Sequence, residues 1–139
     1  MTHYEPLAFW HRPLVPIHAT LTSFPIACFT LTVVTDVIYV QTANLLWLHF
    51  SEWLLLAGLV FGVPALILQA IDLFIVRNRR PWLPLLSGLV VLLLAAINSF
   101  VHTADGWTAV VPYGLSLSVA TVVAMIVTAW LSYGRSRYV

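Results

Sequence analysis

Four long apolar segments dominate the chain, and each is long enough to cross the hydrocarbon core of a bilayer. They cover residues 16–40, 53–76, 82–103 and 110–133, whereas a membrane-spanning helix needs about 20 apolar residues. None of them alternates between apolar and polar positions, as a strand of a membrane barrel does. The pattern therefore predicts an all-α integral membrane protein with four transmembrane helices.

Short polar connections separate these segments, at residues 41–52, 77–81 and 104–109. Connections of this length place each helix antiparallel to the next one. We therefore expect one up-down four-helix bundle over residues 1–139, with no second domain. Pro25 and Pro64 are expected to disturb the first two helices, and Ser51 to cap the second.

The composition agrees with a membrane protein and excludes several other classes. Of the 139 residues 61% are hydrophobic and 8% are charged, whereas a soluble domain has about a quarter charged residues. A soluble enzyme, a nucleic-acid-binding protein and a disordered tail are therefore excluded. The chain contains no Lys, no Gly-rich phosphate loop and no Ser/His/Asp order, so an enzyme is the least favoured class.

All six basic residues fall at three places that a four-helix topology puts on the same side of the membrane. They are Arg12, Arg77, Arg79, Arg80, Arg135 and Arg137. The positive-inside rule assigns that side, and with it both termini, to the cytoplasm. Aromatic residues at the segment ends are expected to anchor the two interfaces. These are Trp10, Trp82 and Tyr133 on the inner side, and Trp47, Trp53 and Trp107 on the outer side.

Each predicted helix carries one stripe of small or polar residues, and such stripes mark helix contacts in lipid. Ionisable residues within a membrane segment are costly and point to a functional site. Together with two polar amides they gather at the two ends of the predicted bundle: His18, Gln69 and Asp72 at the inner end, and Asp36, Asn98 and His102 at the outer end. We expect His18 to pair with Asp72 and His102 with Asp36. One interpretation is purely structural, because an imidazole and a carboxyl group can satisfy each other when both are buried.

Two ligand hypotheses remain open at the outer end. One haem b could be held by His49 and His102, because haem requires axial ligands at one depth; His18 is excluded, since it lies about 20 Å from His102 by helix rise. A Zn, Mn or non-haem Fe ion would instead use imidazole and carboxylate ligands. The candidate metal ligands are Asp36, His49, Glu52, His102 and Asp105.

A proton or small-solute pathway through the bundle is a further alternative, because chains of polar side chains can carry protons. Between the two end clusters, however, the inward stripes contain mainly Ala, Gly, Thr and Met125. No charged residue lies near the expected midplane. The sequence therefore offers no continuous polar path.

Three stretches of the chain form a recognisable combination: PIHATLTSFPIACFTLTVVTD at 16–36, GVPALILQAID at 62–72 and NSFVHTADGWTAVVPYGLSLS at 98–118. On these stretches the chain resembles a bacterial inner-membrane family, domain of unknown function 2231. Members often have Arg before the Asp that follows the third helix, where this chain has Ala104, which leaves His102 as the candidate positive partner. The resemblance implies a four-helix inner-membrane protein, sometimes found alongside redox or dehydrogenase systems.

These observations favour a non-enzymatic protein of the bacterial inner membrane. We expect it to act as a small subunit or anchor of a respiratory or dehydrogenase-type assembly. Connections this short leave no room for a soluble catalytic module. Its expected partners are bilayer lipid and either another membrane protein or a second copy of the chain; nucleic acid is not expected.

Overall fold

The computed structural model describes residues 14–75, 82–104 and 110–135, and these residues are almost entirely helical. The elements in chain order are α2 (Leu14–Thr42), α3 (Leu45–Ile75), α4 (Leu83–Thr103), η1 (Val110–Gly114) and α5 (Leu115–Arg135). The short element η1 is a kinked π-type turn, because Val111 has extended backbone angles within it. Pro25 and Pro64 lie inside α2 and α3, which continue past them.

Four of the described helices are long and apolar enough to cross a membrane. The candidate spans are Ile17–Thr42, Leu45–Phe74, Leu83–Thr103 and Val110–Leu131. The prediction of an all-α membrane fold is therefore confirmed. With 31 residues, α3 is about 46 Å long, longer than a hydrocarbon core of about 30 Å, so a tilted crossing accommodates it best.

The connection between α2 and α3 is much shorter than the sequence pattern predicts. The helix ends are joined by Ala43 and Asn44 alone, so the second helix starts at Leu45 and not at residue 53. Ala43 adopts a left-handed conformation with φ of 50° and donates its N–H to the Tyr39 carbonyl over 2.8 Å. The Asn44 side chain then accepts the Leu46 N–H over 3.0 Å, as an N-cap does. The polar residues in 45–52 interrupt the apolar pattern without interrupting the helix.

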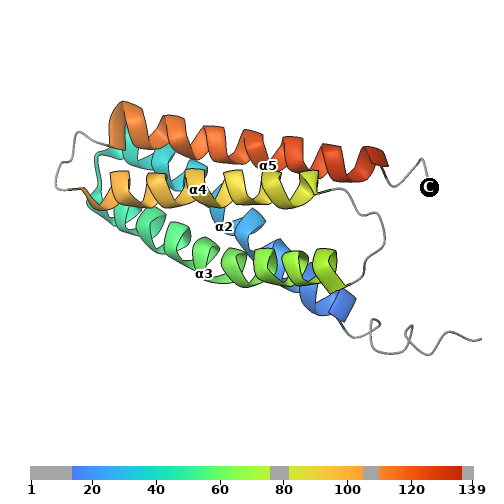
Figure 1. The fold of residues 1–139 in the computed structure, drawn as a ribbon. Helices are drawn as coiled ribbons and strands as arrows, with labels where there is room; N and C mark the ends of the chain where they lie inside the picture. The colour runs from blue at the N-terminus through green and yellow to red at the C-terminus, as the bar shows by residue number, and fades with distance from the viewer. Residues whose placement is uncertain (1–13, 76–81, 105–109, 136–139) are drawn as a thin grey trace, which may run out of the picture.

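The four helices pack as antiparallel neighbours, with α2 lying along α3 and α4 along α5 (Figure 1). We call the end where α2 meets α3, and α4 approaches η1, the Asp36 end; the opposite end is the His18 end. From the Asp36 end, the α2/α3 pair diverges from the α4/α5 pair (Figure 1). The bundle is therefore tighter at the Asp36 end.

The apolar core lies in two clusters. Phe29, Leu55, Val91 and Ala95 form a central cluster from α2, α3 and α4. A second cluster at the Asp36 end contains Tyr39, Leu48 and Val110. Phe29 crosses the α2/α3 interface so closely that a Cβ at Gly58 would come to 2.3 Å from its ring. Glycine at position 58 is therefore what allows Phe29, the largest fully buried side chain among the described residues, to fit.

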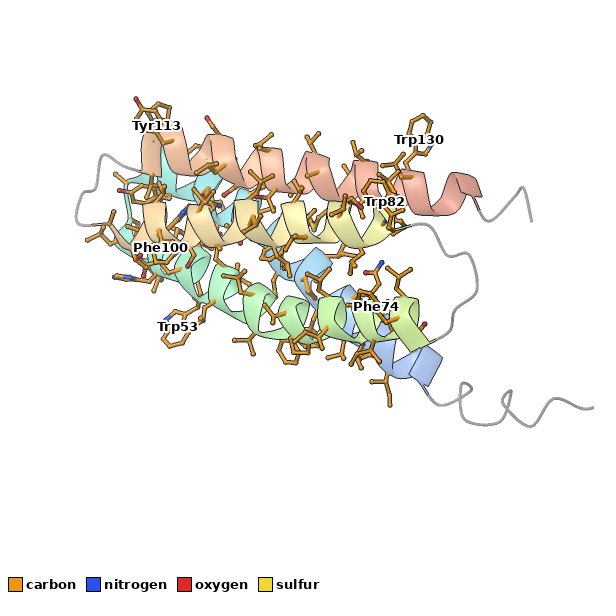
Figure 2. The ribbon with its side chains drawn as sticks, viewed as in Figure 1. Trp53, Phe74, Trp82, Phe100, Tyr113 and Trp130 are labelled. Atoms are coloured by element: carbon orange, nitrogen blue, oxygen red, sulfur yellow. The ribbon has the colours of Figure 1, made fainter. Side chains whose placement is uncertain are left out.

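Bulky apolar side chains cover the outside of the bundle, as expected for a surface that faces lipid. Figure 2 shows exposed aromatic side chains toward both ends of the bundle. Trp53, Phe100 and Tyr113 lie toward the Asp36 end, and Phe74, Trp82 and Trp130 toward the His18 end. This distribution is typical of aromatic belts at two membrane interfaces. Among the predicted anchors, Trp47 is half-buried beside the second cluster, whereas Trp10 and Trp107 lie outside the described residues, as does the side chain of Tyr133.

Candidate functional site

The carboxyl group of Asp36 is completely buried in the last third of α2. Three side chains on three other helices contact it. Ser51 of α3 donates to Oδ1 over 2.5 Å, Ser118 of α5 donates to Oδ2 over 2.5 Å, and His102 Nε2 of α4 lies 2.9 Å from Oδ1. One carboxyl group thus joins all four helices at this end.

A second layer of polar side chains surrounds these contacts. Thr35 Oγ1 lies 2.7 Å from Ser51 Oγ, and Asn98 Nδ2 donates to Ser118 Oγ over 2.8 Å. Thr35 Oγ1 also lies within hydrogen-bond distance of the carbonyl oxygens of Leu31 and Thr32, at 3.1 and 3.0 Å. We call this set the Asp36 network; it comprises Thr35, Asp36, Ser51, Asn98, His102 and Ser118, all of them buried.

The Asp36–His102 contact holds one shared proton. His102 Nδ1 lies 2.9 Å from the carbonyl oxygen of Asn98, and because a carbonyl only accepts, Nδ1 carries a hydrogen. The Nε2–Oδ1 contact then needs a second proton, on either the imidazole or the carboxyl group. In both arrangements the pair has no net charge, which is the state that an apolar environment favours.

Gly114 of η1 lies directly against the imidazole ring of His102. A Cβ at this position would lie 2.9 Å from His102 Cε1 and 3.3 Å from His102 Nδ1. The close approach of η1 to α4 therefore depends on the absence of a side chain at position 114. Asn98 Oδ1 is buried nearby and, among the described residues, has no hydrogen-bond partner.

His49 and Glu52 form a separate pair on the surface of α3. Their side chains are 3.1 Å apart and 62% and 26% exposed, in contrast to the buried Asp36–His102 pair. Within residues 14–75, 82–104 and 110–135, no three His, Cys, Asp or Glu side chains lie close enough to hold a metal ion. Asp105 is outside these ranges, so the metal site that includes it stays a prediction.

The haem hypothesis requires a ring nitrogen of His102 to bind iron. Both nitrogens already take part in hydrogen bonds, Nδ1 with the Asn98 carbonyl and Nε2 with Asp36. Iron ligation would break one of these bonds within a buried network, which is costly. The geometry therefore gives haem no support, and the bis-His pair of His49 and His102 stays a prediction.

The polar residues expected at the inner end lie at the His18 end of the bundle. His18 and Gln69 line an open cavity between the helices. His18 Nε2 is buried and makes no hydrogen bond to any residue that the structure describes. The expected His18–Asp72 pair is therefore not formed through this nitrogen.

Three members of the Asp36 network are not among the site residues that the sequence predicts. They are Thr35, Ser51 and Ser118, of which only Ser51 has an expected role, as a helix cap. The missing signal was the tight turn: Asp36 lies seven residues before Ala43, and Ser51 lies seven residues after Asn44. In a helical hairpin closed by two residues, positions equally far from the turn lie at the same depth, and Ser51 and Asp36 also face each other there.

The comparisons with known proteins identify a family. Neither the curated proteins nor the solved structures include a match to this chain. The family described as "Predicted membrane protein (DUF2231)" matches residues 14–134, which include every described helix almost in full. The chain therefore belongs to the DUF2231 family of predicted membrane proteins.

Proposed function

We propose that the protein is a non-enzymatic membrane subunit or anchor, which packs against another membrane protein in a respiratory or dehydrogenase-type assembly. The observation that carries the proposal is a stripe of small residues on the outer face of α2. Ala19, Ser23, Ala27 and Thr30 are all exposed and follow helical spacing along that face. Such a stripe allows a second helix to approach closely.

The stripe differs from the other outward faces of the bundle. On α4 the exposed positions include Leu93 and Ile97, and on α5 they include Val123 and Ile126. Bulky side chains of this kind suit lipid, whereas small ones leave a shallow surface on which van der Waals contact with another helix is larger.

The hydroxyl groups of the stripe bond to their own helix. Ser23 donates to the Ala19 carbonyl and Thr30 to the Ile26 carbonyl, each over 2.7 Å. The stripe is therefore compatible with lipid before a partner binds. The attraction to a partner helix would come from close packing against the stripe. The Asp36 network would hold α2 in place within the bundle when the partner binds.

The experiment compares the same substitution on two outward faces. Ala27→Leu would fill the α2 stripe, and Ala120→Leu would add the same volume to the exposed face of α5. Tagged variants are expressed at native level, purified from native membranes in mild detergent and analysed by quantitative mass spectrometry. We expect one set of membrane proteins, including redox subunits, to accompany the wild type and Ala120→Leu, and its yield to fall about tenfold for Ala27→Leu, equivalent to about 1.4 kcal/mol.

Two results would contradict the subunit function. The first is a wild-type chain that always purifies alone or only with copies of itself. The second is a set of partners that Ala27→Leu and Ala120→Leu reduce equally, since the α2 stripe would then have no special role. Partners without any redox subunit would retain the packing function and remove the respiratory or dehydrogenase assignment.

A proton or solute pathway is the second candidate, favoured by the shared proton of Asp36 and His102. Against it stands the central apolar cluster, because Phe29, Leu55 and Val91 lie between the Asp36 network and the His18 end. Proton flux into liposomes that fell in both Asp36→Asn and Asp72→Asn would favour the pathway. Flux equal to that of empty liposomes would remove it.

A further inference from the structure

The hydrogen bonds of the Asp36 network include a chain with a direction. Asn98 Nδ2 donates to Ser118 Oγ over 2.8 Å, and Ser118 Oγ donates to Asp36 Oδ2 over 2.5 Å. Both groups thus direct a hydrogen toward the carboxyl group. At the start of the chain one polar atom is left over, because Asn98 Oδ1 is buried and accepts no hydrogen bond from any residue that the structure describes. The chain therefore begins at an acceptor that its direction does not use.

The two carboxyl oxygens of Asp36 differ in how many groups contact them. Oδ1 lies within hydrogen-bond distance of both Ser51 Oγ and His102 Nε2, and these two contacts occupy its two lone pairs. Within the described part of the chain, Oδ2 has one such contact, with Ser118. A further proton on the carboxyl group therefore belongs on Oδ2, which leaves Oδ1 as the carbonyl oxygen that accepts from the other two groups.

His102 links a hydrogen on Oδ2 to the number of protons that the pair holds. Its Nδ1 carries a hydrogen toward the Asn98 carbonyl oxygen. If the one shared proton moved to Oδ2, Nε2 and Oδ1 would face each other at 2.9 Å with no hydrogen between them, and their lone pairs would repel each other. A hydrogen on Oδ2 therefore fits this geometry when Nε2 keeps its own hydrogen, which means that the pair then holds two protons.

We propose that the Asp36 network is a binding site for a second proton, which it accommodates by reversing the chain from Asn98 through Ser118 to Asp36. The incoming proton binds Oδ2, and the new O–H donates to Ser118 Oγ. The Ser118 hydroxyl turns, with its O–H bond intact, and donates to Asn98. The Asn98 amide turns over, so that Oδ1 takes the place of Nδ2 and accepts this hydrogen. The new O–H is the one covalent bond that forms, none breaks, and the net charge of the pair rises by one.

The charged surroundings of the pair favour this added charge. The titratable side chains of the described elements at this end are Tyr39 of α2, His49 and Glu52 of α3, His102 of α4 and Tyr113 of η1, and the described part of α5 has none there. Glu52 interacts electrostatically with His102, and its negative charge opposes the cost of a positively charged pair in an apolar interior. Asp36 itself is completely buried, so the site suits a proton and excludes larger cations.

The test counts the protons on the pair in the full-length chain, reconstituted in lipid nanodiscs. In the one-proton state a protonated Asp36 carboxyl group and a doubly protonated His102 ring exclude each other, whereas the two-proton state contains both. Infrared spectroscopy detects the carbonyl stretch of the protonated carboxyl group, assigned by its loss in Asp36→Asn. NMR of ¹⁵N-labelled histidine detects the imidazolium, assigned by its loss in His102→Gln. We expect both signals together in acid and one of them at most at neutral pH.

Two variants of the chain should shift the pH of second-proton binding in opposite directions. Asn98→Leu removes the acceptor that Ser118 needs in the reversed chain, so the second proton should bind about 1–2 pH units lower, the effect of one lost partner of a buried hydroxyl. Ser118→Ala removes a donor to the ionised carboxylate, whose charge-assisted bonds are the stronger ones, so binding should occur at higher pH. Ser116→Ala, at an exposed serine of α5 that donates to the Pro112 carbonyl, is the matched control and should shift neither signal.

Three results would overturn the proposal. The first needs no variant: a folded wild-type chain that shows the two signals together at no pH. The second is a shift in the same direction for Asn98→Leu and Ser118→Ala, which a general loosening of the packing would produce. The third is an unchanged pH in Asn98→Leu, since Ser118 would then turn its hydroxyl to its own helix and the amide would have no part. Because these readouts involve neither a partner protein nor proton flux, they are independent of both functions proposed above.

Discussion

At the scale of single residues, the burial of Asp36 depends on donors that other helices supply. An isolated carboxylate in an apolar interior costs several kcal/mol, and Asp36 avoids this through Ser51, His102 and Ser118. The shared proton removes the net charge of the pair. It follows that removing one partner costs more than the intact pair contributes.

His102→Ala should therefore be strongly destabilising. It leaves Asp36 buried without the proton that His102 shares, and breaking a buried pair costs about 3–5 kcal/mol. Asp36→Asn should cost less, because the amide Nδ2–H can donate to Nε2 and preserve the contact. His49→Ala, at the exposed pair with Glu52, should cost about 0–1 kcal/mol. Unfolding by SDS titration measures all three, and equal effects of His102→Ala and His49→Ala would contradict the importance of the network.

Gly114→Ala tests how η1 holds the imidazole. The new Cβ would press on His102 Cε1 at 2.9 Å, and overpacking of this kind costs about 1–3 kcal/mol. The cost should largely disappear when His102→Ala is already present, because the methyl group then occupies vacated space. A double-mutant cycle of SDS unfolding measures this coupling. Additive effects would mean that Gly114 matters for the backbone of η1 and not for His102.

The residue types explain what the sequence predicted at this scale. Asp36 and His102 are ionisable residues at the same end of the predicted bundle, so their pairing was expected, and their side chains are 2.9 Å apart. Ser51 was not expected there because the start of α3 was placed too late. A serine hydroxyl also gives no sequence signal of a contact with another helix, because it can hydrogen-bond to a carbonyl of its own helix.

At the scale of elements, the two-residue turn between α2 and α3 is the feature that the pattern of apolar and polar residues did not predict. Ala43 has the left-handed conformation that usually calls for glycine. Without a Gly or Pro to end the helix, the polar positions in 41–52 suggested a longer loop. Leu45, Leu46 and Leu48 in fact continue the apolar face of α3 from its first turn.

Ala43→Gly should stabilise the protein by about 1 kcal/mol. The left-handed conformation costs an L-residue about 1–2 kcal/mol, and glycine does not pay this penalty, although it loses more backbone entropy on folding. Gln41→Gly, two positions earlier and inside α2, is the matched control and should destabilise by about 0.5–1 kcal/mol. Thermal unfolding in detergent, followed by circular dichroism, gives both values. A fall in melting temperature for Ala43→Gly would show that the Ala43 methyl group contributes packing that outweighs the strain.

At the scale of the whole molecule, the two ends of the bundle are built differently. The Asp36 end is closed by hydrogen bonds between four helices, whereas the His18 end diverges around a cavity of about 250 Å³. The four apolar segments predicted the bundle because length and hydrophobicity dominate folding in lipid. The cavity was not predicted, because it arises from the angle between helix pairs, which depends on packing and not on periodicity.

Orientation in the membrane is the property that the internal contacts determine least, because inverting the bundle changes none of them. The prediction of cytoplasmic termini therefore rests on the arginines and can be tested by labelling. In a Cys28→Ala background, Asn44→Cys lies at the exposed α2–α3 turn, whereas Asn78→Cys lies in the arginine-rich second connection, outside the described residues. A membrane-impermeant maleimide added to spheroplasts should label position 44 directly and position 78 only after permeabilisation. The reverse pattern would place the arginines outside and the Asp36 end in the cytoplasm, and the positive-inside assignment would be wrong.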